Sequence, residues 1–147
     1  MEMITMSNER DIRIAYLLLR ITLGTNICVH GVSRIFVGQS AFAHSLIPLF
    51  QKTFLPAWSV LAFGLALPWL EAILGLFLLV GMRTYFALTT GSLLLIALTF
   101  GSTLRQDWES AGLQLIYALI YAVLVAFHHQ NTYSLDALFQ SRKRIRK

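Results

Sequence analysis

Residues 55–82 read LPAWSVLAFGLALPWLEAILGLFLLVGM, a continuous apolar run in which Glu71 is the single charged residue. A helix needs roughly 20 apolar residues to cross a hydrocarbon core about 30 Å thick, so this run predicts a membrane-spanning helix. A carboxylate at that depth costs roughly 2.5–3.5 kcal/mol on insertion scales. Glu71 is therefore the first candidate for a functional residue.

Three further apolar runs of similar length accompany this one. They cover about residues 12–36, 85–104 and 111–129, and hydrophobic residues make up 56% of the chain against 13% charged residues. This composition is far from that of a soluble domain. The runs are continuous rather than alternating, which argues against a transmembrane barrel. We therefore predict an all-α integral membrane four-helix bundle that forms a single domain over residues 1–147.

The distribution of Lys and Arg predicts how the bundle is oriented. Eight of the twelve Lys and Arg residues lie on one side, in the basic tail 140–147, in the turn after residue 82 and around the start of the first apolar run. Three lie on the other side, and Arg20 lies within the membrane. The positive-inside rule then puts both termini of this multi-pass protein in the cytoplasm. We interpret the basic tail as a contact with anionic membrane lipids and predict no nucleic-acid partner.

Metal and haem sites lack their usual sequence signals. The single Cys28 excludes an internal disulfide and a thiolate metal cluster. A haem held by two histidines needs both at the same depth. His30 falls near the outer surface, His128 and His129 near the inner surface, and His44 in the outer loop. We therefore predict no haem and no metal.

Depth arithmetic suggests a partner for Glu71. If the first helix enters near Arg13 and the second leaves near Val80, Arg20 and Glu71 lie roughly 10 Å and 13 Å from the same edge, at 1.5 Å per residue. We therefore predict an Arg20–Glu71 pair and treat both residues as catalytic candidates. The alternative is that the pair only neutralises itself inside the bundle.

A second polar cluster is predicted in the outer half of the bundle. Helical spacing puts three of its side chains on one face of the first run and three on one stripe of the fourth run. These are Asn26, His30 and Arg34, and Gln114, Tyr117 and Tyr121. Hydrogen-bond donors of these types suit a carbonyl, a quinone head or an anion, and Trp69 is a candidate to flank a ring. The alternative is an interfacial His and Arg that reach to water.

Four short motifs resemble the DoxX family of small bacterial membrane proteins (DoxX/DoxD-like). They are LRITLG at 19–24, VHGVSR at 29–34, PWLEAILG at 68–75 and LVGMRT at 79–84, and the resemblance spans about residues 14–130. Arg34 departs from the Lys that the family pattern leads us to expect, with the charge kept. The resemblance implies a membrane subunit linked to redox chemistry. Relatives include the small subunit of an archaeal thiosulfate:quinone oxidoreductase and a member of a membrane complex with superoxide dismutase and a sulfurtransferase.

Three functions are open at this stage. The first is a quinone-interacting membrane subunit of a redox complex, with electrons supplied by a partner. The second is a non-catalytic anchor or assembly subunit, in which the buried charges are structural. The third is a small-solute or proton pathway, for which four helices would have to form a homo-oligomer.

Overall fold

The computed structural model describes the backbone of residues 2–145 and the side chains of residues 8–142. Its elements follow in the order α1 (Glu2–Leu46), the 3₁₀ helix η1 (Ile47–Phe50), α2 (Ala57–Val80), α3 (Thr84–Leu104), α4 (Trp108–Ala126), the 3₁₀ helix η2 (His128–Gln130) and α5 (Leu135–Ile145). The predicted all-helical class is confirmed for these residues. Four of the helices are long and apolar enough to cross a membrane, which indicates a membrane protein.

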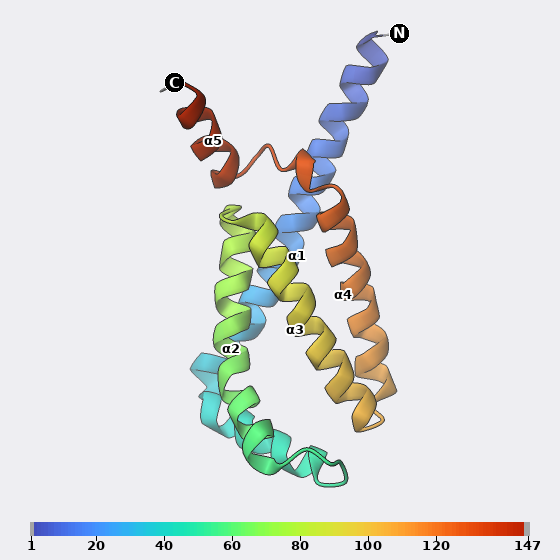
Figure 1. Cartoon of the computed structure of the whole chain (residues 1–147), viewed down its shortest axis with the longest axis vertical. Coiled ribbons are helices and arrows are strands. Elements are labelled where there is room, and N and C mark those ends of the chain that lie inside the picture. The colour runs from blue at the N-terminus through green and yellow to red at the C-terminus, as the bar shows by residue number, and fades with distance from the viewer. Residues whose placement is uncertain (1, 146–147) are drawn as a thin grey trace.

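The four long helices alternate in direction, so both termini lie at the same end of the molecule (Figure 1). We call this the terminal end, and the opposite end the elbow end, after the bend of α1 described below. The helices associate as two pairs, with α1 packed mainly on α2 and α3 mainly on α4. A space between the two pairs is therefore built into the fold.

Glycines let α1 and α2 approach until their backbones touch. A Cβ added to Gly31 would overlap the backbone of Ala72 and Pro68, and one added to Gly75 would lie 2.6 Å from the Cα of Cys28. Small residues at such contacts are the usual route to tight helix association in a bilayer, where no hydrophobic driving force acts between helices. These contacts fix the register of α1 against α2.

The first helix is longer than predicted and sharply bent. The sequence predicted an end near residue 36, and the straight part of α1 does end close by, at Gly38, where φ is 133°; a second helical piece then continues to Leu46. Glycine is the residue that adopts such a φ without steric cost. The bent part packs back on α2, because Ala43 is fully buried and approaches Gly64. We call residues 39–54 the elbow.

The α3–α4 turn at the elbow end is held by a helix cap. The Asp107 carboxylate accepts hydrogen bonds from the backbone N–H of Ser110 at 3.1 Å and from its hydroxyl at 2.7 Å. Arg105 pairs with the same carboxylate at 2.6 Å. These bonds, first those from Ser110 and then the charge of Arg105, lower the pKa of Asp107. The carboxylate is therefore a stable N-cap for α4.

At the terminal end, α5 is tied to the α2–α3 turn. The Asp136 carboxylate accepts hydrogen bonds from the backbone N–H groups of Arg83 and Thr84, each at 2.7 Å, and so caps the start of α3. The Asp136 N–H donates in turn to the Gly81 carbonyl at 3.0 Å. Much of the predicted basic tail is therefore helical, while residues 146–147 lie outside the described part.

Candidate functional site

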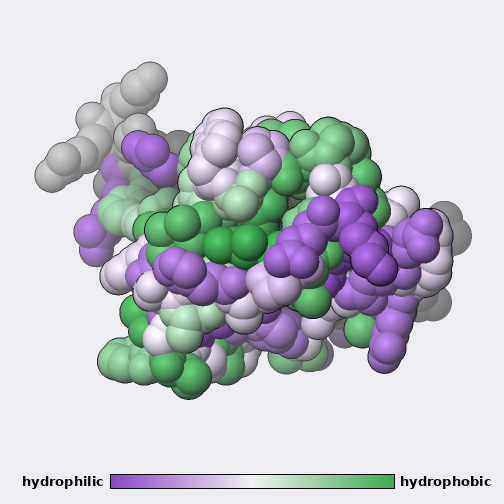
Figure 2. Space-filling view, turned by 90° about the horizontal axis from the view of Figure 1, so that it is seen from below, coloured by the Kyte–Doolittle hydropathy of each residue, from purple (hydrophilic) through white to green (hydrophobic). Residues whose placement is uncertain are grey.

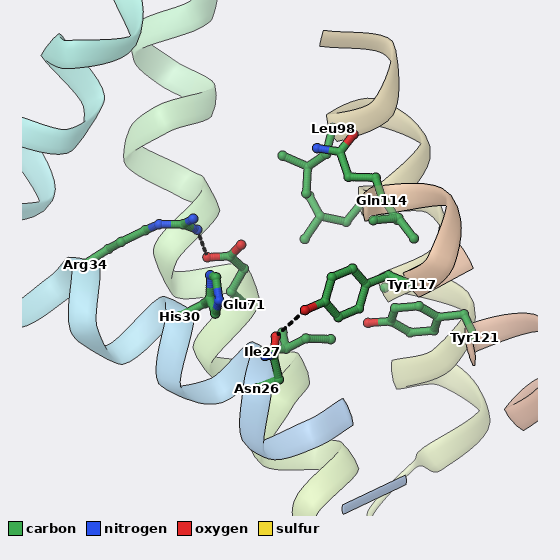
Figure 3. A pocket seen from close by; sticks show the side chains of 12 residues that line it. Asn26, Ile27, His30, Arg34, Glu71, Leu98, Gln114, Tyr117 and Tyr121 are labelled. Atoms are coloured by element: carbon green, nitrogen blue, oxygen red, sulfur yellow. Dashed lines mark hydrogen bonds and ion pairs between the residues drawn. The ribbon is translucent and has the colours of Figure 1, made fainter. Parts of the chain in front are cut away.

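A polar cavity of about 190 Å³ lies between the two helix pairs. Its lining residues come from all four long helices, and Figure 3 shows the polar ones pointing toward one another. They are Asn26, Ile27, His30 and Arg34 of α1, Glu71 of α2, Gly91, Leu94, Leu95 and Leu98 of α3, and Gln114, Tyr117 and Tyr121 of α4. The cavity thus brings together seven of the nine candidate residues that the sequence suggested.

An ion pair crosses one wall of the cavity. Arg34 of α1 donates from Nη1 to the carboxylate of Glu71 on α2 (Figure 3). Glu71 is 8% exposed, whereas the Arg34 side chain is 28% exposed. The Arg34 guanidinium also lies over the Phe42 ring, 4.7 Å from its centroid. An ion pair between two helices, shielded on one side by an aromatic ring, holds both charges at a fixed place in apolar surroundings.

The predicted pairing of Glu71 with Arg20 is wrong, because Arg34 takes that place. Depth arithmetic assumed that α1 enters the apolar region near Arg13. The glycine contacts set a different register, in which Gly31 lies against Ala72 while Gly24 lies against Leu78 and Leu79. Arg20, one turn before Gly24, therefore lies beside the end of α2. Arg34, shortly after Gly31, lies beside Glu71.

Arg20 stabilises the terminal end of the fold instead of the cavity. It is 2% exposed and donates to the carbonyl oxygens of Leu78, of Leu79 at 3.2 Å and of Tyr133 at 2.8 Å. The first two carbonyls belong to the last turn of α2, where hydrogen-bond partners are lacking and positive charge is favourable. Arg20 thus caps α2 and fastens the segment that leads into α5.

Hydrogen bonds fix two of the polar side chains on the other wall of the cavity. The Tyr117 hydroxyl of α4 donates to Oδ1 of Asn26 on α1 at 3.2 Å, which joins the two helix pairs (Figure 3). Gln114 donates from Nε2 to the Ser102 hydroxyl at 3.0 Å. Its Oε1 is buried and has no hydrogen-bond partner among the described residues. A buried acceptor without a partner suits a site where a ligand or water donates.

Tyr121 and His30 complete the polar lining. The Tyr121 hydroxyl lies against Gly91, where any Cβ would overlap it. His30 lies one helical turn before Arg34 and is exposed. Trp69, the proposed ring neighbour, does not line the cavity and is 50% exposed on the outer face of α2. Trp69 is two residues before Glu71 and therefore lies on a different face of α2. The prediction that Trp69 flanks a ring in the cavity is wrong.

Sequence reasoning missed the contribution of α3. Gly91 and three leucines of α3 form most of the apolar part of the wall, together with Ile27 of α1. Leucines are common throughout a membrane helix, so their spacing gave no signal. Gly91 was the available sign, because a glycine inside a helix often marks a close approach by another group.

A second, larger cavity of about 480 Å³ adjoins the first at the elbow end and shares Arg34, Leu98 and Gln114 with it. Viewed from that end, Figure 2 shows hydrophobic surface beside hydrophilic groups. Among the described residues, no group of three or more His, Cys, Asp or Glu side chains could hold a metal ion.

Comparison with known proteins adds no relative. No family model, no curated protein and no solved structure matches the chain. The resemblance to the DoxX family therefore stays a prediction.

Proposed function

We propose that this chain is a membrane subunit of a redox complex and that its polar cavity binds the head group of a quinone. The observation that carries the proposal is the cavity itself, in which seven of the twelve lining residues are polar or charged within otherwise apolar helices. Polar groups at such depth are costly in lipid and mark ligand or proton pathways. In this proposal the protein lies in the bacterial inner membrane with both termini in the cytoplasm, as the positive-inside rule suggests.

The cavity offers hydrogen-bond donors and acceptors to the two oxygens of a quinone head. A quinone has carbonyl oxygens that accept hydrogen bonds, and Arg34 and Tyr121 are donors along the lining. A quinol has hydroxyl groups that donate, and the Glu71 carboxylate and Gln114 Oε1 are acceptors. Both redox forms therefore find partners on the same walls.

The redox step requires two electrons and two protons for each quinone that becomes a quinol. We assign the electrons to a redox partner subunit and the proton exchange to Glu71 and His30. Arg34 replaces Arg20 as the cation that positions Glu71. Arg20 has no catalytic part in this proposal, because it does not line the cavity and its Nη1 and Nη2 groups donate to backbone carbonyls.

Quinone extraction from the purified protein tests this proposal. We expect quinone to co-purify with the wild type. The quinone content should fall several-fold in Glu71→Gln, because the neutral amide forms no ion pair with Arg34 and takes up no proton. Glu109→Gln, the same change at an exposed acid in the first turn of α4, should leave the content unchanged. If no variant carries quinone and titration shows no binding, the proposal fails. A stable partner protein without quinone would then favour the anchor function.

A further inference from the structure

The cavity at the elbow end is lined mainly by apolar side chains. Its walls come from the elbow, from the first half of α2 and from the last turns of α3. Typical members are Phe42, Leu46, Leu49, Phe50, Phe63 and Leu67. A space of about 480 Å³ with such a lining fits hydrocarbon rather than a polar ligand.

The bend of α1 builds this cavity. Gly38 turns the chain back, and the contact of Ala43 with Gly64 seats the bent helix on α2. η1 then carries Phe50 across to α3, where its ring lies 3.4 Å from the position of a Cβ on Gly101. The elbow therefore closes over the space between the helix pairs.

Arg34 and Gln114 stand at the junction of the two cavities, since both line each of them. The Arg34 guanidinium binds Glu71 in the polar cavity and stacks on Phe42 of the elbow. If the head of a ligand lay beside Glu71, its tail would have to pass Arg34 and Gln114 to reach the elbow. The two spaces therefore have the layout of a site for one molecule with a polar head and an apolar tail.

The charges of the elbow cavity argue against an anionic lipid as its occupant. Its lining includes two arginines, and both have acidic partners within the protein. Arg34 pairs with Glu71, and Arg105 pairs with Asp107 at 2.6 Å. Each guanidinium is already neutralised by a carboxylate, so an added phosphate would be repelled by that carboxylate, whereas a neutral chain leaves both pairs intact.

We propose that the elbow cavity holds the start of the hydrocarbon tail of the ligand whose head lies in the polar cavity, so that the site takes isoprenoid-tailed quinones. This inference rests on the proposed quinone function. A tail gains little hydrophobic free energy when it moves from lipid into protein, because both surroundings are apolar. The elbow therefore selects a tail by shape and packing, and filling the space should exclude it.

A pair of glycine substitutions tests this inference. Gly101 lines the elbow cavity, and a Cβ there makes only ordinary contacts with Phe50. Gly101→Leu should therefore occupy the cavity without disturbing the backbone. Gly112→Leu is the matched control, because a Cβ on Gly112 meets no atom within 4 Å. Dissociation constants are measured in lipid nanodiscs for a tail-less benzoquinone and for the same head with an isoprenoid tail.

We expect Gly101→Leu to weaken binding of the tailed quinone by about tenfold, the size of an ordinary overpacking penalty, and to leave the tail-less quinone unchanged. Gly112→Leu should change neither. If Gly101→Leu does not fold, Ser59→Leu fills the same cavity with the loss of only one local hydroxyl bond, to Pro56.

The two failures are distinct. If the wild type binds the tail-less quinone but the cavity variant weakens both ligands equally, or neither, the tail site is refuted and the quinone function stands. The cavity would then be filled by a bilayer lipid or by nothing. If the wild type binds neither quinone, the proposed function itself fails.

Discussion

At the scale of single residues, two arginines of α1 have different functions. Arg34 pairs with Glu71 inside the polar cavity, and Arg20 binds backbone carbonyls of α2 and of the segment before α5. Both are arginines within apolar helices, so composition alone does not distinguish them. Their partners do, since a carboxylate in a cavity is available to a ligand and a carbonyl at a helix end is not.

The two arginines should therefore respond differently to the same substitution. We predict that Arg20→Gln lowers stability by about 1–3 kcal/mol, because it leaves buried carbonyl oxygens without donors. The protein that remains folded should bind quinone like the wild type. Arg34→Gln should weaken quinone binding more than it lowers the melting temperature. Thermal unfolding and quinone titration of both variants check this, and the reverse pattern would refute the assignment.

At the scale of elements, the pairing of α1 with α2 fixes the position of the site. Gly31 and Gly75 allow backbone contact, and the resulting register places Arg34 beside Glu71. The second pair, α3 with α4, provides the tyrosines and joins the first through the bond between Tyr117 and Asn26. The cavity thus lies where two helix pairs, each closely packed within itself, make fewer contacts with each other.

Glycine-to-alanine changes separate these contacts from helix propensity. We predict that Gly31→Ala destabilises the protein by about 1–3 kcal/mol, because its methyl group overlaps the backbone of α2. Gly112→Ala should instead stabilise it by about 0.5–1 kcal/mol, since alanine is the better helix former and the position is open. Unfolding in mixed detergent measures both, and equal effects would show that Gly31 makes no close contact.

At the scale of the whole molecule, both termini lie at one end of the four long helices, and the elbow covers the other (Figure 1). The basic residues of α5 are at the terminal end, where Asp136 fastens the helix to the α2–α3 turn. The positive-inside rule assigns this end to the cytoplasm. We propose this orientation for the chain, in which the elbow lies on the side of the membrane that faces away from the cytoplasm.

Reporter fusions test this orientation. We predict that a fluorescent protein fused after Lys147 is bright and that alkaline phosphatase at the same place is inactive, because the first folds in the cytoplasm and the second needs an oxidising compartment. Phosphatase inserted at Lys52, in the elbow, should be active. Activity at the C-terminus and none in the elbow would invert the assignment.

Much of the fold could be predicted from the sequence, because long apolar runs leave few alternatives to membrane helices. The polar lining of the cavity followed as well, since His30 and Arg34 share a helix face and Tyr117 and Tyr121 share another. The sequence did not predict that Arg34 is the partner of Glu71. Depth counted from estimated helix ends carries an error of several residues, whereas the contacts of Gly31 and Gly75 fix the register directly. The break of α1 at Gly38 agrees with the predicted end near residue 36, whereas the sequence did not predict that the following helical piece folds back on α2 through Ala43 and Gly64.

Photolabelling with an azidoquinone tests the central claim, that a quinone head binds between the two helix pairs. Peptides from the labelled protein are mapped by mass spectrometry, with unlabelled quinone as competitor. We predict labels on residues 26–34 of α1 and 114–121 of α4, lost with competitor and reduced in Glu71→Gln. Labels confined to the lipid-facing surface, or undiminished by competitor, would contradict the claim.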